Sequence, residues 1–164
     1  MKIHKAYTLK YRRKREGKTD YKSRLGLLAS RRLIIVVRST LSNIHVQVVE
    51  YSPTGDKTLI SVDSRELLKY GWKGHRGNTT SSYLTGMLCG LKAKKKGIKE
   101  GILDLGLNRA IKGSSLFAAV KGLKLSIEVP CNEDYFPNEE RIKGQHLKKG
   151  NYDEVRKKIL EKWQ

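Results

Sequence analysis

Cysteine is scarce in this 164-residue chain. Its two cysteines, Cys89 and Cys131, lie far apart and form no CxxC pair. Thiolate metal sites need paired ligands at short spacing, and disulfide-dependent domains need several cysteines. The sequence therefore predicts neither a zinc site nor a disulfide framework, which is compatible with a reducing cytoplasm. Cys89 lies in an apolar helical pattern, so we expect it to pack as a small hydrophobic residue.

Long apolar runs are also missing. No run approaches the roughly 18 apolar residues that span a bilayer. The first residues contain no apolar stretch of the kind found in signal peptides. The basic N-terminal stretch lacks the apolar face that a helix on a membrane surface needs. We therefore expect no membrane partner.

Acidic residues are few. The chain has 16 Asp and Glu against 35 Lys and Arg, a formal net charge of +19. Like charges at this density repel one another in the compact state, and solubility alone needs a net charge of only about 2 to 8. By itself the excess predicts a polyanionic partner, which is nucleic acid, an acidic membrane surface or an acidic protein, and the missing apolar face argues against the membrane. Hydrophobic residues, at 38%, suffice for one folded core.

Recognisable catalytic motifs are absent from the sequence. In the glycine-bounded stretch 106–114, Lys112 precedes the second glycine, whereas a Walker loop has its lysine after that glycine. No GxGxxG string and no nucleophile-elbow serine occurs. The four histidines have no ligand spacing; they are His4, His45, His75 and His146.

Ribonuclease-H-like enzymes have a similar order of strands and helices, but they need clustered carboxylates that hold two metal ions. The carboxylates of Glu50, Asp63 and Asp104 are scattered. We interpret them as solvated or structural groups, so a metal-dependent RNA nuclease is a weak alternative. We expect no enzymatic activity, no cofactor, no metal and no small-molecule substrate.

Apolar alternation and turn residues predict an antiparallel meander of three strands. Residues 33–38 form an apolar run typical of a strand buried on both faces, and residues 44–51 and 58–62 follow as strands. The intervening turns fall at 39–43 and at 53–56, and in the second of these Pro53 and Gly55 favour a turn.

Helical patterns follow the meander. A short helix is predicted at 64–70 and a long one from about 78 to 95, in which we expect Gly86 and Gly90 to allow close approach to the sheet. The apolar stripe of the long helix comprises Tyr83, Leu84, Met87, Leu88 and Leu91. A fourth strand is predicted at 101–106, then a helix capped by Ser114. This order predicts an α/β sandwich of one mixed sheet with helices against it.

The chain changes character after Pro130 and becomes nearly neutral. We predict an irregular excursion around 135–137 and a closing helix from Asn151, with Glu154 as a capping-box partner. One side of that helix carries Tyr152, Val155, Ile159 and Trp163. The predicted division is a basic arm and helix start over 1–24, an α/β core over 25–130, and the excursion and helix over 131–164.

The first 24 residues carry ten Lys and Arg against Glu16 and Asp20. This composition predicts an extended arm that becomes ordered on a partner, followed by a helix that starts at Thr19 or Asp20. Its cations can neutralise phosphates, and interleaved tyrosines can stack on unpaired bases, which is typical of RNA. The tyrosines are Tyr7, Tyr11 and Tyr21, and core packing is an equally good interpretation of Tyr21.

A glycine-rich loop at 71–78 is the second candidate RNA contact, because glycines allow close approach to phosphate and a helix N-terminus follows. Trp72 either stacks on a base or anchors the loop, and we favour anchoring. A third basic cluster at 92–99 is also an ordinary feature of a helix end. The candidate RNA-binding residues are Lys10, Tyr11, Arg12, Arg13, Lys14, Arg15, Lys18, Thr19, Tyr21, Lys22, Arg24, Trp72, Lys73, His75, Arg76, Asn78 and Arg109.

DNA-binding motifs such as a helix-turn-helix, a zinc finger or a heptad zipper are not recognisable, which favours structured RNA over DNA. Several short sequence segments also favour an RNA-binding protein. These segments are residues 11–21, 33–40, 70–73, 78–80, 83–86, 102–106 and 129–130. In these segments, which occur in the same order, the chain resembles the archaeal and eukaryotic branch of the eighteenth large-subunit ribosomal protein family. Its short length resembles archaeal members.

This resemblance implies a three-layer α/β/α fold with a mixed sheet. It also implies a non-enzymatic protein of the cytoplasmic ribosome that binds 5S rRNA and attaches it to the large-subunit rRNA, beside other large-subunit proteins of the central protuberance. The basic arm would be the main RNA contact and the glycine-rich loop a second one. Family members often have His-Ser after the proline that matches Pro130, where this chain has Cys131 and Asn132. The other open interpretation is an RNA chaperone or ribosome-assembly factor.

Overall fold

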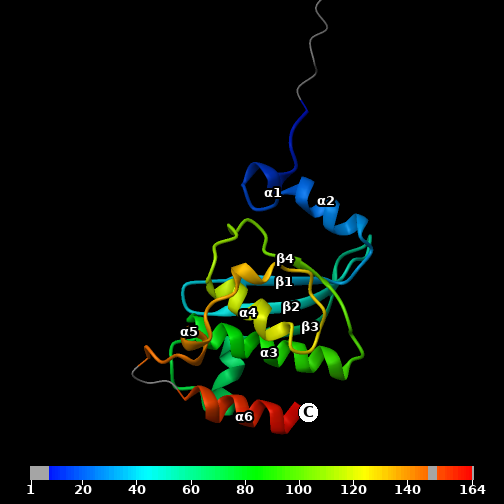
Figure 1. Ribbon diagram of the computed structural model, residues 1–164. Helices are drawn as coiled ribbons and strands as arrows, with labels where there is room; N and C mark the ends of the chain where they lie inside the picture. The colour runs from blue at the N-terminus through cyan, green and yellow to red at the C-terminus, as the bar shows by residue number, and fades with distance from the viewer. Residues whose placement is uncertain (1–7, 148–150, 164) are drawn as a thin grey trace, which may run out of the picture.

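The computed structural model describes residues 8–147 and 151–163 (Figure 1). Its order of strands and helices agrees with the sequence prediction from residue 33 to residue 123. In chain order the elements are α1 (Arg12–Arg15), α2 (Tyr21–Ala29), β1 (Ile34–Ser39), β2 (Ile44–Glu50), β3 (Lys57–Asp63), the 3-10 helix η1 (Ser64–Tyr70), α3 (Thr79–Lys95), β4 (Ile102–Asp104), α4 (Ser115–Leu123), the 3-10 helix η2 (Glu133–Tyr135), α5 (Glu139–Lys143) and α6 (Tyr152–Trp163).

The four strands form one mixed sheet in the order β3-β2-β1-β4. Short turns make β1, β2 and β3 antiparallel neighbours, with Ile34 opposite Val49 and Val46 opposite Val62. The chain reaches β4 only after crossing over through α3, and β4 therefore pairs in parallel with β1, with Ile34 beside Ile102. The predicted α/β class with a mixed sheet is confirmed.

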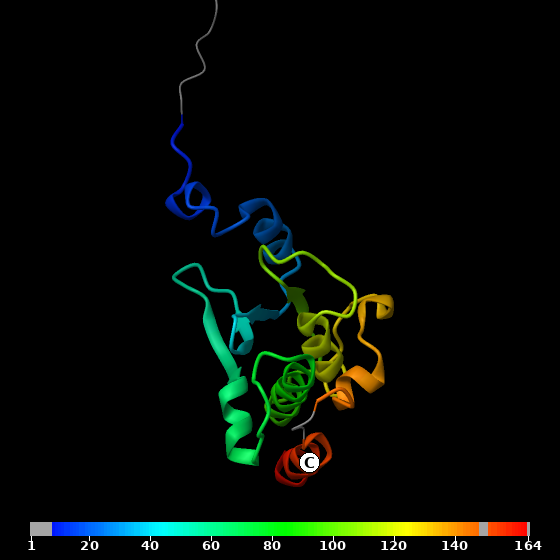
Figure 2. The same cartoon turned by 90° about the vertical axis from the view of Figure 1, so that its left-hand side faces the viewer.

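One face of the sheet and the helices α3 and α4 form the hydrophobic core. Alternate residues of the strands point toward these helices, and Ile35, Val37, Val46, Val48 and Val62 are fully buried. The long helix α3 is buried on most of its surface, not only along the predicted apolar stripe. Helix α3 lies between the sheet, α4, α5 and α6, and the view along its axis shows this arrangement (Figure 2).

Glycines determine how closely α3 and α4 pack. A Cβ atom added at Gly86 would lie 2.0 Å from the carbonyl oxygen of Ala119, and one added at Gly122 would lie 2.2 Å from that of Tyr83. A Cβ at Gly90 would lie 3.1 Å from the carbonyl oxygen of Leu123. The prediction that Gly86 and Gly90 approach the sheet is therefore wrong, because both face α4.

Polar pairs occupy the opposite face of the sheet. Arg38 Nη2 lies 2.7 Å from Asp104 Oδ2, and His45 Nδ1 lies 2.9 Å from Asp63 Oδ2. Asp63 also caps η1, accepting from the backbone N–H of Arg65 at 2.7 Å. These partners explain both carboxylates as structural groups, as predicted. Within residues 8–147 and 151–163, no three metal-ligating side chains gather at one place, and no helix has the length and apolar character to cross a bilayer.

The C-terminal segment is more regular than predicted. The irregular excursion contains η2 and α5, and residues 125–129 contribute only a bridge between Glu128 and Glu100. Helix α6 buries Tyr152, Val155 and Ile159, as its predicted face requires. Those residues belong to the same core cluster as the sheet, and the predicted three-part division stays a prediction.

Two predicted helix caps form differently. Ser114 is the N-cap residue of α4, as predicted, but its buried hydroxyl makes no hydrogen bond with any residue that the structure describes. Asn151 Nδ2 donates to Glu154 Oε2 at 3.5 Å and to the carbonyl oxygen of Gly71 at 2.7 Å. The side chain of Asn151 therefore ties the start of α6 to the loop after η1.

Candidate nucleic-acid interface

The basic N-terminal segment is helical from its twelfth residue. Arg12–Arg15 form one turn, α1, so the prediction of an extended arm is wrong there. Glu16 joins this turn to the next residues, because its carboxylate lies 2.8 Å from Arg12 Nε and 2.9 Å from Lys18 Nζ. The hydrogen bond from Arg12, and then the one from Lys18, lowers the pKa of Glu16 below its ordinary value. Residues 1–7 of the predicted arm, with Tyr7, lie outside the described residues.

Helix α2 begins where the sequence predicted. Asp20 is its N-cap, and its carboxylate accepts from the backbone N–H groups of Lys22 at 3.0 Å and Ser23 at 3.4 Å. Every residue of α2 is at least partly exposed, and Leu25 is 69% exposed. The ring of Tyr21 lies 5.3 Å from that of Tyr11, so Tyr21 packs against the N-terminal segment and not in the main core.

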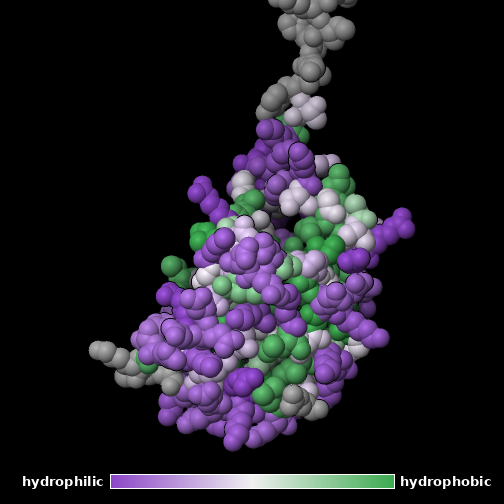
Figure 3. Space-filling model, in the orientation of Figure 1, coloured by the Kyte–Doolittle hydropathy of each residue, from purple (hydrophilic) through white to green (hydrophobic). Residues whose placement is uncertain are grey.

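A hollow of about 320 Å³ separates these helices from the end of the sheet. Arg13, Lys18 and Arg24 line one wall. Arg38 of β1 and Asn108 of the loop after β4 belong to the other wall. The surface is hollowed below the N-terminal helices, with hydrophilic residues above the hollow and a hydrophobic area beside it (Figure 3). Asp20 and Asp104 also line the hollow, so its four cationic side chains outnumber two carboxylates. The site is therefore a groove of net positive charge, which we call the cationic groove, and segments far apart in the sequence build it.

Several of these cations are held in position. Arg13 Nε donates to Thr19 Oγ1 at 2.8 Å, and Arg24 Nη2 lies 2.7 Å from Asp56 Oδ2. Arg38 Nη1 donates to the carbonyl oxygen of Asp104 at 2.6 Å. A guanidinium has five N–H groups, so each arginine keeps donors for a ligand. Others make no side-chain hydrogen bond or ion pair with the described residues: these are Lys10, Lys14, Arg15 and Lys22.

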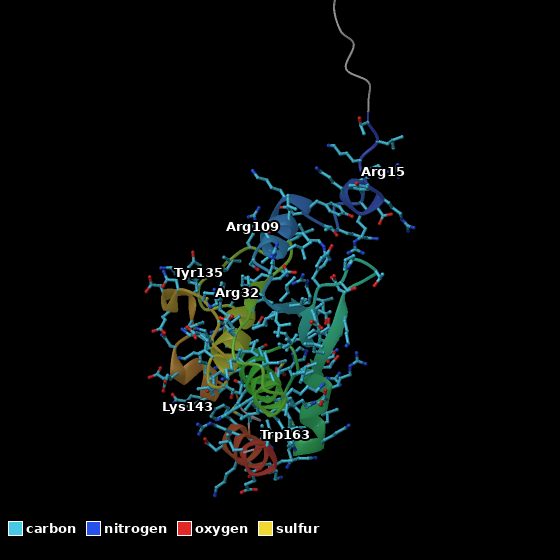
Figure 4. The ribbon with its side chains drawn as sticks, turned by 90° about the vertical axis from the view of Figure 1, so that its right-hand side faces the viewer. Arg15, Arg32, Arg109, Tyr135, Lys143 and Trp163 are labelled. Atoms are coloured by element: carbon cyan, nitrogen blue, oxygen red, sulfur yellow. The ribbon has the colours of Figure 1, made fainter. Side chains whose placement is uncertain are left out.

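Sequence reasoning missed Arg38 as a groove residue. It ends an apolar strand, and nothing in its local pattern separates it from an ordinary surface arginine. Gly106 makes room for it, because a Cβ atom there would lie 2.8 Å from Arg38 Cζ, and its φ of +64° also favours glycine. The predicted Arg109 follows in the same loop, which rises from β4 toward α2, and Figure 4 labels it there (Figure 4).

Trp72 is part of the core. Its side chain is 2% exposed, and its Nε1 donates to the carbonyl oxygen of His75 at 3.3 Å. A Cβ atom at Gly74 would lie 2.7 Å from the Trp72 ring, which explains the glycine at that position. The predicted RNA contact of Trp72 is therefore wrong for this conformation, and the anchoring interpretation is correct.

Asn78 acts as a helix cap, since its Oδ1 accepts from the backbone N–H of Ser81 at 2.7 Å. Lys73 and His75 are exposed on the loop, and Arg76 is half-buried. A Cβ atom at Gly77 would lie 3.0 Å from the carbonyl oxygen of Leu41, so the loop packs against the turn between β1 and β2. The structure thus keeps the glycine-rich loop apart from α1 and α2, as Figures 1 and 2 show.

A comparison with protein families agrees with the geometry. Residues 5–100 match the family described as "Ribosomal large subunit proteins 60S L5, and 50S L18". This match is more than half of the chain and includes α1, α2, the three-strand meander and α3. The chain belongs to this family, which makes it an RNA-binding structural constituent of the large subunit in the cytoplasmic ribosome.

Proposed function

We propose that the chain binds 5S rRNA through its N-terminal end and attaches it to the large-subunit rRNA in the central protuberance. One observation carries this proposal, namely the cationic groove between α1–α2 and the end of the sheet. The cations on and around it are Lys10, Arg12, Arg13, Lys14, Arg15, Lys18, Lys22, Arg24, Arg38 and Arg109.

The two groups of cations have different tasks. Cations that pair with none of the described side chains, such as Arg15 and Lys22, attract the RNA backbone and release its counterions. Arg13, Arg24 and Arg38 are held by neighbouring side chains, so their donors have defined directions and can read the shape of a folded RNA. Tyr11 is 73% exposed and offers a ring face to an unpaired base.

The glycine-rich loop provides a separate RNA contact in this proposal. Lys73 and His75 are exposed on a loop that Trp72 and Asn151 hold to the body. His75 Nδ1 accepts from the backbone N–H of Gly77 at 3.1 Å, which orients its ring. Because this loop lies away from α1, it would touch a different part of the RNA or the neighbouring large-subunit RNA. Other large-subunit proteins complete the surroundings.

A ribosome-assembly factor or RNA chaperone is the second candidate. The exposure of α1 and α2 favours it, since no residue of either helix is fully buried and both helices would adapt to many RNAs. We do not propose a nuclease, because Asp63 and Asp104 are engaged by His45 and Arg38. The chain is expected to leave RNA intact in the presence of magnesium.

The test is equilibrium binding of the full chain to folded 5S rRNA and to transfer RNA across a salt series. Preference for 5S rRNA that survives moderate salt is the expected result, because defined donors read shape in addition to charge. Equal binding to both RNAs that disappears as salt rises would reject 5S recognition and favour the chaperone function.

A further inference from the structure

A second group of cations surrounds Trp163, at the end of the molecule opposite Arg15 (Figure 4). The ammonium groups of Lys92 and Lys95 lie 5.6 and 5.3 Å from the centroid of the Trp163 ring. Trp163 Nε1 donates to the hydroxyl oxygen of Tyr70 at 2.8 Å, and Lys162 Nζ lies 5.7 Å from the Tyr70 ring. Two aromatic rings therefore join η1, α3 and α6 and gather lysines from two helices.

Two hollows border the Trp163 ring. One, of about 470 Å³, has apolar walls from Leu59 and Ile60 and a rim of Lys92, Lys95 and Lys96. The other, of about 330 Å³, lies beside Leu91 and is rimmed by Lys94, Lys95 and Lys162. Each hollow thus combines apolar or aromatic walls with a rim of cations. We call this region, comprising Leu59, Ile60, Leu91, Lys92, Lys94, Lys95, Lys96, Lys162 and Trp163, the Trp163 surface.

The charge of this surface exceeds what the fold requires. Residues 92–99 contain five lysines and no acidic residue. The carboxyl end of a helix favours cations, which accounts for lysines in the last turn of α3. The same preference applies to Lys162 in the last turn of α6. It does not require two such helix ends to meet at one aromatic ring, and lysines four residues apart, such as Lys92 and Lys96, repel one another. Glu66 neutralises Lys92, with 2.6 Å between Oε2 and Nζ, and leaves the other lysines of the Trp163 surface without an acidic partner among the described residues.

We propose that the Trp163 surface is a second RNA-binding site, which takes an unpaired nucleotide beside Trp163 and places its flanking phosphates on the lysines. A planar base suits a hollow with an aromatic wall, and phosphates suit a rim of ammonium groups. An acidic peptide would satisfy the lysines but would leave the apolar walls without a matching group. The site lies far from the N-terminal groove, so one domain holds two RNA segments at the same time.

This site extends the proposed function but does not depend on 5S recognition by the N-terminal end. The test therefore uses the full chain with Arg12, Arg13, Lys14 and Arg15 replaced by Ala. The probe is a single-stranded oligoadenylate of eight nucleotides, which has no base pairs, and an oligoglutamate of equal charge is the comparison. Binding is followed by quenching of tryptophan fluorescence. Trp72 is buried, and a Trp163→Phe version of the same protein identifies the contribution of Trp163.

Two further pairs of substitutions test the lysines in this background. Lys94→Gln with Lys95→Gln removes two rim cations, and Lys143→Gln with Lys157→Gln removes two exposed cations elsewhere. We expect oligoadenylate to quench Trp163. We also expect the first pair to lower the salt slope of log K by about 1.4, at about 0.7 for each single-strand phosphate contact. The second pair should leave that slope unchanged.

Three results would overturn the proposal. The first is absence of Trp163 quenching by oligoadenylate. The second is binding of oligoglutamate as tightly as oligoadenylate, which would indicate an acidic protein partner. The third is an equal effect of the two pairs of substitutions. Failure of the intact chain to prefer 5S rRNA would reject only the proposed function, because this binding is measured without the four N-terminal cations.

Discussion

The triple substitution of Arg12, Arg13 and Arg15 by Ala should flatten the salt dependence of RNA binding. In a helix of 3.6 residues per turn these three side chains lie within an arc of about 160°, so they can face one RNA backbone. Each phosphate contact contributes about 0.7 to 0.9 to the slope of log K against log salt, so losing three lowers that slope by about 2.1 to 2.7.

The slope translates into a measurable change in affinity. Between about 50 and about 200 mM salt, the affinity ratio of the unsubstituted chain to the triple variant should shrink by about 20- to 40-fold. Folding should be little affected, since α1 buries no residue and the bonds from Arg12 to Glu16 and from Arg13 to Thr19 lie at the surface. Thermal unfolding of the variant checks this point.

Filter binding or fluorescence anisotropy with 5S rRNA measures the slope. The matched control replaces three exposed cations far from the groove, Arg141, Lys143 and Lys157, by Ala. A slope that is unchanged in the triple variant, or reduced equally in the control, would refute the assignment of α1 to phosphate contacts. A lower affinity at every salt concentration with an unchanged slope would point to a loss of shape complementarity instead.

Three predictions concern the body of the protein. Gly122→Ala should destabilise the protein by about 1 to 3 kcal/mol, because the added methyl group would overpack against a backbone carbonyl of α3. Gly26→Ala in the exposed α2 should be neutral or stabilising by up to about 1 kcal/mol. Chemical denaturation compares the two variants. Trp72→Ala should cost about 3 to 5 kcal/mol in the same assay, and a loss of RNA binding without a loss of stability would contradict its role as an anchor. Burial raises the pKa of Cys89 to about 12 from 9.0. The buried neutral thiol therefore contributes fully to stability below pH 9, and this contribution is lost as the pH rises toward 12, because the unfolded chain then loses the thiol proton more readily. A thiol reagent at pH 8 should modify the half-exposed Cys131 and reach Cys89 only after unfolding, and rapid modification of both would contradict this burial.

Two RNA-binding ends would explain how a small domain connects RNA segments. The N-terminal groove is bordered by helices in which no residue is fully buried, whereas the Trp163 surface includes the end of α3, a helix that is buried on most of its surface. The first end is suited to adapting its shape to a folded RNA. The second presents its lysines from a rigid support, which reduces the conformational entropy lost on binding.

The sequence alone determined the class of partner, the order of the central elements and the family. Net charge is a property of composition, and strands such as Ile44–Glu50 follow from an alternation that repeats every two residues. The cap at Asp20 was also predictable, because an N-cap interacts with residues two and three positions later. These signals depend only on residues close together in the sequence, so they can be read without knowledge of the fold.

Only the tertiary structure decided which distant residues meet. It placed Arg38 in the groove with Arg24, directed Gly86 toward α4, and buried Trp72. It also brought Trp163 to Lys92, which lies 71 positions earlier in the chain (163 − 92). Such contacts depend on how helices and strands close around one core, and side chains with the same local pattern can be buried or exposed in different folds. For that reason the composition indicates that the chain binds RNA, but the packing determines where.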